Sequence, residues 1–355
     1  MELGAFVVVP GGEEFSGFSD VRSPIAAAAE KVRPLYSSRM PVLGNDVLQS
    51  WIERVRQLGV HNLWLTSSPH DGSLAHSLAE FARQGIERML LIKLKSYAEM
   101  DLADLLRFHC ERRNPVTEAH DAQGRLGVSL LDQLALQTEI QNSIGQNSIC
   151  SNSIGSSSTG QESASNLHQY QFSGYAKRIL SARERQELVG DGLTGACAMR
   201  PAGTAMGDQV WIGEGAKVAD SVRIIGPAYI GERSIIRAGA TIGPFTSVER
   251  DCEVDCGTTV ERSTILPNTY LAPGLLVQDG LVDGGYMEHL VWETVADLRP
   301  AGLGSRIERP KSTKLAYSTS ANNSNKSGLL RAESAFAWDL TAASTASQPW
   351  RRVQL

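Results

Sequence analysis

The sequence lacks any apolar run close to the roughly 20 residues that a membrane-spanning helix needs. Its 34 basic residues form no cluster, and 39 acidic residues leave a net charge of −5, which argues against a nucleic-acid or membrane-surface partner. The five cysteines follow neither a metal-binding nor a disulfide spacing. The apolar stretch at 5–9 is short and has no basic region before it, which favours a buried strand over a signal peptide. We therefore expect a cytoplasmic protein.

What the sequence does contain is an apolar residue at every sixth position over a long stretch. A helical period of 3.6 and a strand period of two do not select every sixth residue. A fixed short period marks structural repeats that bury their apolar faces by stacking on their neighbours. The period of six predicts a parallel β-helix, in which each hexapeptide forms one flat side of a triangular coil. The apolar positions are Ile212, Val218, Ile224, Ile230, Ile236, Ile242, Val248, Val254 and Val260.

Small or compact residues stand four places beyond these apolar positions. They run from Ala216 to Thr264 and include Cys252, which we interpret as a compact core residue. Glycines follow three of the apolar positions, where a tight corner tolerates glycine best: Gly213, Gly231 and Gly243. Because the open end and flat faces of such a coil invite further pairing, we expect a homo-oligomer formed through the β-helix.

The N-terminal part of the chain has a different pattern. Apolar strand-like segments alternate with amphipathic helical segments, joined by short connections. This alternation predicts a parallel sheet covered by helices on both faces, an α/β domain of the doubly wound type over residues 1–135. The expected strands lie at 6–10, 62–66 and 88–94, and the expected helices at 45–58, 73–83 and 102–113. Asn45 and Asp101 are the expected helix caps.

Composition divides the rest of the chain. Residues 136–172 repeat Asn-Ser-Ile and are rich in glycine and serine, which predicts a low-complexity flexible insertion. Residues 173–204 regain helical character and are expected to form a helical connector between the two domains. We assign 205–300 to the β-helix and its cap. Residues 301–355 are polar and indicate a disordered tail.

Several stretches of the N-terminal domain carry a resemblance to a known family. They are Arg-Pro-Leu at 33–35, Pro-Val-Leu at 41–43, the helix ending at 55–60, and the segment LLIKLKSYAEMDLADLLRFH at 90–109. Together with the hexapeptide repeats, they resemble the sugar-phosphate nucleotidyltransferases, whose α/β domain is followed by a left-handed β-helix. This resemblance implies a protein of nucleotide-sugar metabolism with a nucleotide or sugar phosphate as its ligand.

The resemblance also implies a reaction and a set of binding residues. In that family a sugar 1-phosphate attacks the α-phosphate of a nucleoside triphosphate, and pyrophosphate leaves. A glycine-rich loop cradles the phosphates, a lysine supports them, and an aspartate holds Mg²⁺. The matching positions here are Gly11 and Gly12 in the loop, Arg33 in place of the lysine, and Lys95 in place of the aspartate.

The departures from this pattern leave two alternatives open. A charged lysine does not ligate Mg²⁺. Lys95 therefore places a positive charge where the family has a negatively charged metal ligand, and we assign no metal ligand. Glu13 and Glu14 stand where triphosphate would lie. If these acids supply the missing carboxylate, the chain is an enzyme with an altered site that uses Mg²⁺. Otherwise it is a non-catalytic binding or regulatory subunit of a pyrophosphorylase.

A third alternative comes from the end of the repeat. The coil also resembles hexapeptide-repeat acyltransferases, which use a histidine between coils as a base on a sugar hydroxyl or amine. His289 follows the last predicted coil and stands next to Glu288. A histidine beside a carboxylate suits general base chemistry. His289 is therefore the candidate base under this alternative.

Overall fold

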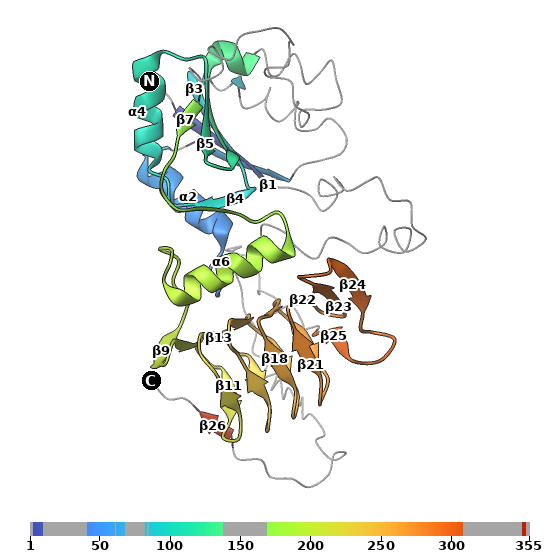
Figure 1. The fold of residues 1–355 in the computed structure, drawn as a ribbon. Helices are drawn as coiled ribbons and strands as arrows, with labels where there is room; N and C mark the ends of the chain where they lie inside the picture. The colour runs from blue at the N-terminus through green and yellow to red at the C-terminus, as the bar shows by residue number, and fades with distance from the viewer. Residues whose placement is uncertain are drawn as a thin grey trace, which may run out of the picture.

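The computed structural model describes residues 3–9, 41–60, 62–67, 82–83, 85–137, 169–307 and 350–352. Gly11, Gly12 and Arg33 lie outside these residues, as do Glu13 and Glu14 and nearly all of the helix expected at 73–83. The described chain forms an N-terminal sheet domain, a helix below it, and a stack of short strands (Figure 1). No helix among the described residues has the length and hydropathy needed to cross a membrane.

The N-terminal domain is built on a six-stranded mixed sheet. Its strand order is β2-β1-β3-β6-β5-β7. β1 pairs in parallel with β2 on one side and β3 on the other, whereas β6 runs antiparallel to both β3 and β5. The strands are β1 (Leu3–Val9), β2 (Asn62–Ser67), β3 (Arg88–Lys93), β5 (Val116–Asp121), β6 (Gly124–Asp132) and β7 (Gln169–Gln171).

This topology corrects the predicted doubly wound parallel sheet. The parallel arrangement holds for β2, β1 and β3, but β5 and β6 form a hairpin that the sequence analysis missed. Two residues, Ala122 and Gln123, join them, and Gly124 has a φ of 117°, a conformation that favours glycine. A connection of two residues permits antiparallel pairing only, because parallel strands must be joined by a long crossover.

Two helices pack on this sheet. α2 (Val47–Gln57) buries one face that includes Trp51, and α4 (Leu102–Arg112) buries Leu105 and His109. The side chain of Asp101 accepts a hydrogen bond from Ala103 N, so the predicted cap of α4 is confirmed. The predicted cap of α2 is wrong. Asp46 caps this helix, since Asn45 lies in a turn and donates from Nδ2 to the backbone of Leu43 and Arg200.

A third helix, α6 (Ala182–Thr194), lies between the sheet domain and the stacked strands (Figure 1). Ser181 and Glu184 form a capping box at its start. A two-stranded sheet of β4 (Ser96–Ala98) and β8 (Ala176–Arg178) leads into it. Leu188 and Val189 of α6 belong to the same buried cluster as α2, α4 and Tyr229 from the coil, so the two parts share one core.

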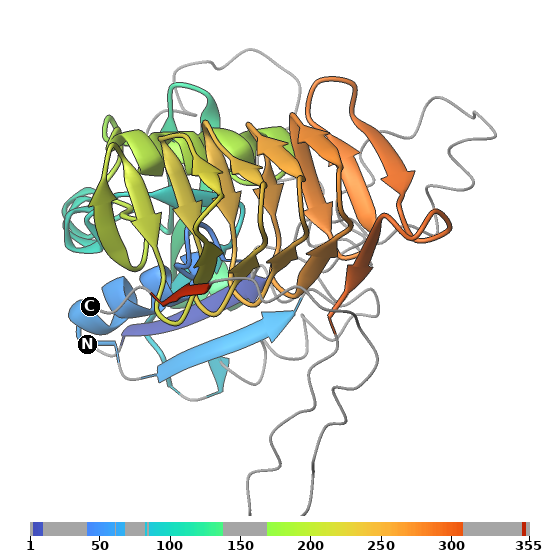
Figure 2. The same cartoon turned by 90° about the horizontal axis from the view of Figure 1, so that it is seen from below.

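The C-terminal part is a hexapeptide β-helix made of three sheets of short strands, stacked in parallel (Figure 2). Val210 pairs with Ala228, and Ala228 pairs with Thr246, which is one coil of 18 residues at each step. The first sheet contains β10 (Val210–Ile212), β13 (Ala228–Ile230), β16 (Thr246–Val248), β19 (Thr264–Ile265) and β22 (Gly280–Asp283). The second contains β11 (Lys217–Ala219), β14 (Ile235–Ile236), β17 (Glu253–Val254) and β20 (Thr269–Leu271). The third contains β12 (Arg223–Ile224), β15 (Thr241–Ile242), β18 (Thr259–Glu261) and β21 (Leu276–Gln278).

Additional strands complete the ends of the coil. β9 (Thr204–Gly207) pairs with β10, and β23 (Tyr286–His289) and β24 (Thr294–Asp297) extend the same sheet beyond β22. Within the predicted tail, β25 (Gly304–Arg306) pairs with β20 and β26 (Trp350–Arg352) pairs with β11. Within the predicted insertion, β7 joins the N-terminal sheet. The remaining residues of both segments are outside the described part of the chain, apart from 136–137, 172, 301–303 and 307.

The interior of the coil is filled by the predicted apolar positions. From Ile230 to Val260 they are all fully buried, and Cys252 lies among them. Beyond Val260 the period changes, because Ser247 pairs with Thr264, one residue earlier than an 18-residue coil would place it. Ser263 therefore takes the small interior position predicted for Thr264, and the apolar series continues at Ile265, Leu271, Val277 and Val282.

The glycines after the apolar positions serve the stacking of coils. At Gly231 an added Cβ would lie 2.5 Å from the carbonyl carbon of Glu249 in the next coil, and at Gly213 it would lie 2.5 Å from Glu232 N. Neither glycine has a positive φ. The prediction that a tight corner requires glycine is therefore wrong at these two positions. Glycine is needed there because the backbones of neighbouring coils approach closely.

Candidate functional site

The order of strands in the N-terminal sheet marks one edge as a place for a ligand. From β1 the chain continues to β2 on one side of β1 and then returns to β3 on the other side. In open α/β sheets ligands bind beyond the carboxyl ends of the strands at such a switch point. Here the two strand ends are Val9 of β1 and Lys93 of β3. Val8 and Lys93 are register partners, so the two strand ends are adjacent.

Two lysines stand at the carboxyl end of β3. Lys93 is its last residue, and Lys95 follows after the buried Leu94. The backbone here is well fixed: Leu94 N donates to Val8 O at 2.9 Å, Lys95 N to Lys93 O at 2.7 Å, and Ile179 N to Lys95 O at 3.1 Å. Both side chains are partly exposed. Among the residues that the structure describes, none bonds to either ammonium group.

The neighbouring hairpin of β5 and β6 carries an ion pair at the same edge. Arg178 of β8 donates to both carboxylate oxygens of Asp121, at 3.0 and 2.9 Å, and to Oε1 of Gln123 at 2.9 Å. These hydrogen bonds from Arg178 hold the pKa of Asp121 below its usual value. Asp121 is thus paired with Arg178 rather than with either lysine.

The described residues at this edge do not fit the Mg²⁺ ion that the nucleotidyltransferase resemblance implies. Magnesium is held by oxygen ligands, usually carboxylates and substrate phosphates. Lys95 occupies the position of the expected aspartate, and in the described ranges no three histidine, cysteine or acidic side chains are grouped to hold a metal. We therefore derive no step through a metal at this site.

A buried acid ties the sheet domain to the coil. The carboxylate of Glu249 accepts hydrogen bonds from Leu43 N at 2.8 Å, Gly44 N at 2.9 Å and the hydroxyl of Ser247 at 2.8 Å. Glu249 is completely buried, and burial raises its pKa. The turn that it holds leads directly into α2. Nothing in the sequence distinguished Glu249 from the surface acids around it.

Arg185 of α6 is the buried cation at this junction. It donates to Pro41 O at 3.1 Å, and burial lowers its pKa to about 10 against the attraction of Glu249, so it remains charged at neutral pH. The next residue, Gln186, donates to Phe245 O at 2.7 Å and accepts from the hydroxyl of Thr264 at 2.6 Å. One turn of α6 therefore connects the segment before α2 to two successive coils.

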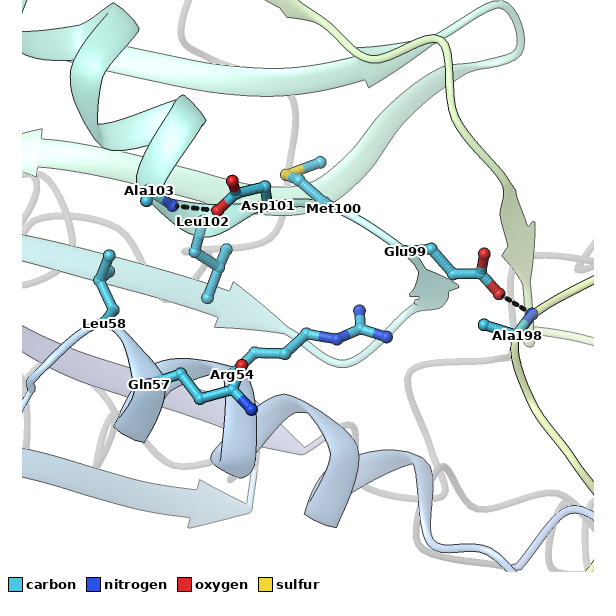
Figure 3. Close-up of a pocket in the computed structure, with 9 residues that line it drawn as sticks. All are labelled: Arg54, Gln57, Leu58, Glu99, Met100, Asp101, Leu102, Ala103 and Ala198. Atoms are coloured by element: carbon cyan, nitrogen blue, oxygen red, sulfur yellow. Dashed lines mark hydrogen bonds between the residues drawn. The ribbon is translucent and has the colours of Figure 1, made fainter.

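A cavity of about 490 Å³ opens between the end of α2 and the start of α4 (Figure 3). Arg54, Glu99 and Asp101 supply its charged lining. Each of them has a protein partner: Arg54 donates to Ala98 O, Glu99 accepts from Ala198 N, and Asp101 accepts from Ala103 N.

His289 lies at the end of the coil, in β23. Its Nδ1 accepts from Val291 N at 3.2 Å and Trp292 N at 3.5 Å, and its ring stacks on Trp292 with centroids 4.3 Å apart. In the neutral ring, Nε2 then carries the proton, which leaves no free lone pair for general base chemistry. The geometry thus gives His289 a role in holding the turn that precedes β24.

Glu288 points to the opposite face of β23 and is buried, and this burial, with the nearby Glu293, raises its pKa from 4.5 to about 7. At a pH between these two pKa values, Glu288 is protonated in the folded state and ionised in the unfolded state. Stability is therefore expected to fall as pH rises from about 4.5 to about 7. Glu288→Gln is expected to remove this dependence and to stabilise the protein by about 1–2 kcal/mol at pH 8. Urea unfolding across this pH range tests it, with Glu111→Gln, at an exposed acid of α4, as control; an unchanged slope for Glu288→Gln would refute the assignment.

Comparison with known families identifies only the coil. Residues 209–244 match the family model described as bacterial transferase hexapeptide (six repeats). The matched segment begins just before β10 and ends just after β15, within the regular part of the β-helix. No curated protein was found to match the sequence. The chain thus combines a hexapeptide-repeat transferase segment with an N-terminal mixed α/β sheet.

Proposed function

We propose that the sheet domain binds a nucleotide sugar or a sugar phosphate beyond the carboxyl ends of β1 and β3. In this proposal the chain is a binding or regulatory relative of the sugar-phosphate nucleotidyltransferases. The observation that carries it is the pair Lys93 and Lys95 at the switch point of the sheet. Lysine ammonium groups are compact charges with three donors each and are well suited to phosphate oxygens.

Binding is favoured over nucleotidyl transfer by the charge at this edge. Phosphoryl and nucleotidyl transfer depend on positioning and on neutralising charge that develops in the transition state, commonly with bridging metal ions. Lys95 stands where the family resemblance places the metal-binding aspartate, and two described acids of β5 are already paired, Asp121 with Arg178 and Glu118 with Arg125. The described residues suit the holding of a phosphate more than the release of pyrophosphate.

The contacts of α6 suggest how binding is communicated. The carbonyl of Pro41 accepts from Arg185 of α6, and the turn before α2 is held by Glu249 of the coil. The start of α2 in the sheet domain is therefore fixed by contacts with α6 and the β-helix. These contacts support a regulatory role in which the sheet domain and the coil respond together to a ligand.

A thermal-shift titration of the full chain tests the function. The ligands are UDP-glucose, GDP-mannose, ADP-glucose, glucose 1-phosphate, nucleoside triphosphates and acetyl-CoA, each with and without Mg²⁺. A ligand that binds the folded state stabilises it by about 2.7 kcal/mol at a hundred times its Kd. We expect such a shift with at least one nucleotide sugar or sugar phosphate.

The other outcomes separate the alternatives. Absence of a shift with every phosphorylated sugar and nucleotide would overturn the proposal. A shift with acetyl-CoA alone would favour the hexapeptide acyltransferase alternative. Pyrophosphate released from a triphosphate and a sugar 1-phosphate would show that the chain is an active nucleotidyltransferase, and would replace the binding role.

A further inference from the structure

The cavity between the end of α2 and the start of α4 has no part in the proposed function. Its volume of about 490 Å³ is within the range of small-molecule binding sites. All of its lining residues belong to the described part of the chain. Arg54 reaches it from α2 and Glu99 from the segment between β4 and α4, so a ligand there would meet charges of both signs (Figure 3).

The guanidinium of Arg54 is held in place by its neighbours. Its Cζ lies 5.3 Å from the ring centroid of Trp51 and 5.5 Å from that of Tyr97, and Nη1 donates to Ala98 O. Both aromatic rings are buried. A guanidinium has five N–H donors, and no carboxylate among the described residues forms an ion pair with Arg54. Donors of Arg54 therefore remain for an anionic group in the cavity.

Tyr97 also positions the opposite charge. Its hydroxyl donates to Oε1 of Glu99 at 3.2 Å, and the amide of Ala198 donates to the same oxygen. Burial raises the pKa of Tyr97 to about 12, so the hydroxyl keeps its proton at neutral pH. Oε2 of Glu99 accepts no hydrogen bond from the described residues. One tyrosine thus places a cation at its ring and a carboxylate at its hydroxyl, and both line the same cavity.

The other lining groups decide which ligand fits. Asp101 is a further charge, but it caps α4 at the positive end of the helix dipole, which already stabilises its carboxylate. Met100 and Leu102 are buried and give the cavity an apolar part. Taking Arg54 and Glu99 out of water is best compensated by a ligand that brings an opposite charge to each of them. A phosphate would be repelled by Glu99, and a simple amine by Arg54.

We propose that this cavity binds a small zwitterion, a free amino acid with an apolar side chain. Its carboxylate accepts hydrogen bonds from Arg54, its ammonium group donates to Oε2 of Glu99, and its side chain packs against Met100 and Leu102. This site is separate from the ends of β1 and β3, so the inference does not depend on the proposed binding of a phosphate. The fixed position of Arg54 and Glu99 lowers the cost of ordering the site.

Calorimetric titration of the full chain with L-leucine, leucinamide and isocaproate tests the proposal. Leucinamide is leucine without the carboxylate, and isocaproate is leucine without the ammonium group. Each analogue is expected to bind about tenfold or more weakly than leucine, because a charged hydrogen bond is lost. L-glutamate and L-lysine are also expected to bind more weakly, since their side-chain charge would lie against the apolar part of the cavity.

Two substitutions assign the two ends of the ligand. Glu99→Gln keeps an acceptor for Ala198 N but removes the charge. It is expected to weaken leucine about tenfold and to leave isocaproate unchanged or stronger. Arg54→Gln is expected to weaken leucine by a similar factor and to leave leucinamide unchanged or stronger. The matched controls Glu111→Gln in α4 and Arg56→Gln in α2 change exposed residues outside the cavity, and are expected to bind leucine as the wild type does.

The outcomes separate this inference from the proposed function. Equal binding of leucine and both analogues would overturn it, and so would leucine binding that neither Glu99→Gln nor Arg54→Gln weakens. Absence of binding by both leucine and L-methionine would overturn it as well, without bearing on the phosphate site. Thermal unfolding of each variant without ligand shows whether it is folded. If Arg54→Gln does not fold, Glu99→Gln and the two analogues still decide.

Discussion

Glu249→Ala is expected to lower the free energy of unfolding by about 3–5 kcal/mol, because it removes the acceptor of several hydrogen bonds and the carboxylate whose charge opposes a buried cation. The substitution would leave the amides of Leu43 and Gly44 and the hydroxyl of Ser247 without their acceptor. It would also leave the charge of Arg185 buried without the carboxylate that opposes it. The effect is large because Leu43, Ser247 and Arg185 are buried, so that solvent cannot replace the lost acceptor.

Urea unfolding followed by tryptophan fluorescence and by circular dichroism measures this effect. Glu232→Ala is a suitable control, because Glu232 belongs to the same coil region but has a side chain that is 45% exposed. Its loss is expected to change stability by less than about 0.5 kcal/mol. A change below about 1 kcal/mol for Glu249→Ala would show that the buried carboxylate does not hold the junction.

Gly231→Ala is expected to destabilise the protein by about 3 kcal/mol or more, at the upper end of the cost of overpacking. The new methyl group would lie 2.5 Å from the carbonyl carbon of Glu249 and 2.6 Å from Arg250 N. Both are backbone atoms of the adjacent coil and cannot rotate away as a side chain can. Relief requires that two stacked coils move apart, which weakens their packing and the hydrogen bond from Gly231 N to Val248 O.

The same substitution at Gly190 is expected to have the opposite sign. Gly190 lies inside α6, and the nearest atom to an added Cβ is Cδ1 of Phe245 at 3.9 Å, an ordinary contact. Alanine in a helix interior is favoured over glycine by about 0.5–1 kcal/mol. Unfolding curves of the two variants therefore give a direct test. Equal effects at the two positions would contradict the assignment of Gly231 to coil stacking.

The β-helix could be predicted from the sequence because its interior is specified by local repetition. Each coil buries the same position of each hexapeptide, so the buried residues from Ile230 to Val260 can be found from their spacing alone. After Val260 the period of six no longer predicts the buried positions, and the reason is again local. One residue fewer at the corner near Arg262, which has a φ of 44°, moves the apolar series to Ile265. A strict count of six cannot follow such a change.

The N-terminal sheet and its site were less predictable because they depend on contacts between distant residues. The apolar pattern predicted β1, α2 and α4, but the direction of β6 depends on which strand it pairs with. Lys95 was found by resemblance. Arg178 was not, because only the pairing of β8 with β4 brings it to the hairpin tip and Asp121. The surroundings of His289 were likewise not foreseen, since they arise from the turn that brings Trp292 onto its ring.

The shared core described above bears on how this chain can be divided. Tyr229 of the second coil is buried in the same cluster as α2 and α6, and the phenolic oxygen lies where a side chain at Gly44 would stand. Cutting the chain between sheet and coil would expose this cluster on both fragments. The sheet domain and the β-helix are therefore not interchangeable modules. A β-helix taken from another protein would need an aromatic side chain in the place of Tyr229 to fill the core of the sheet domain.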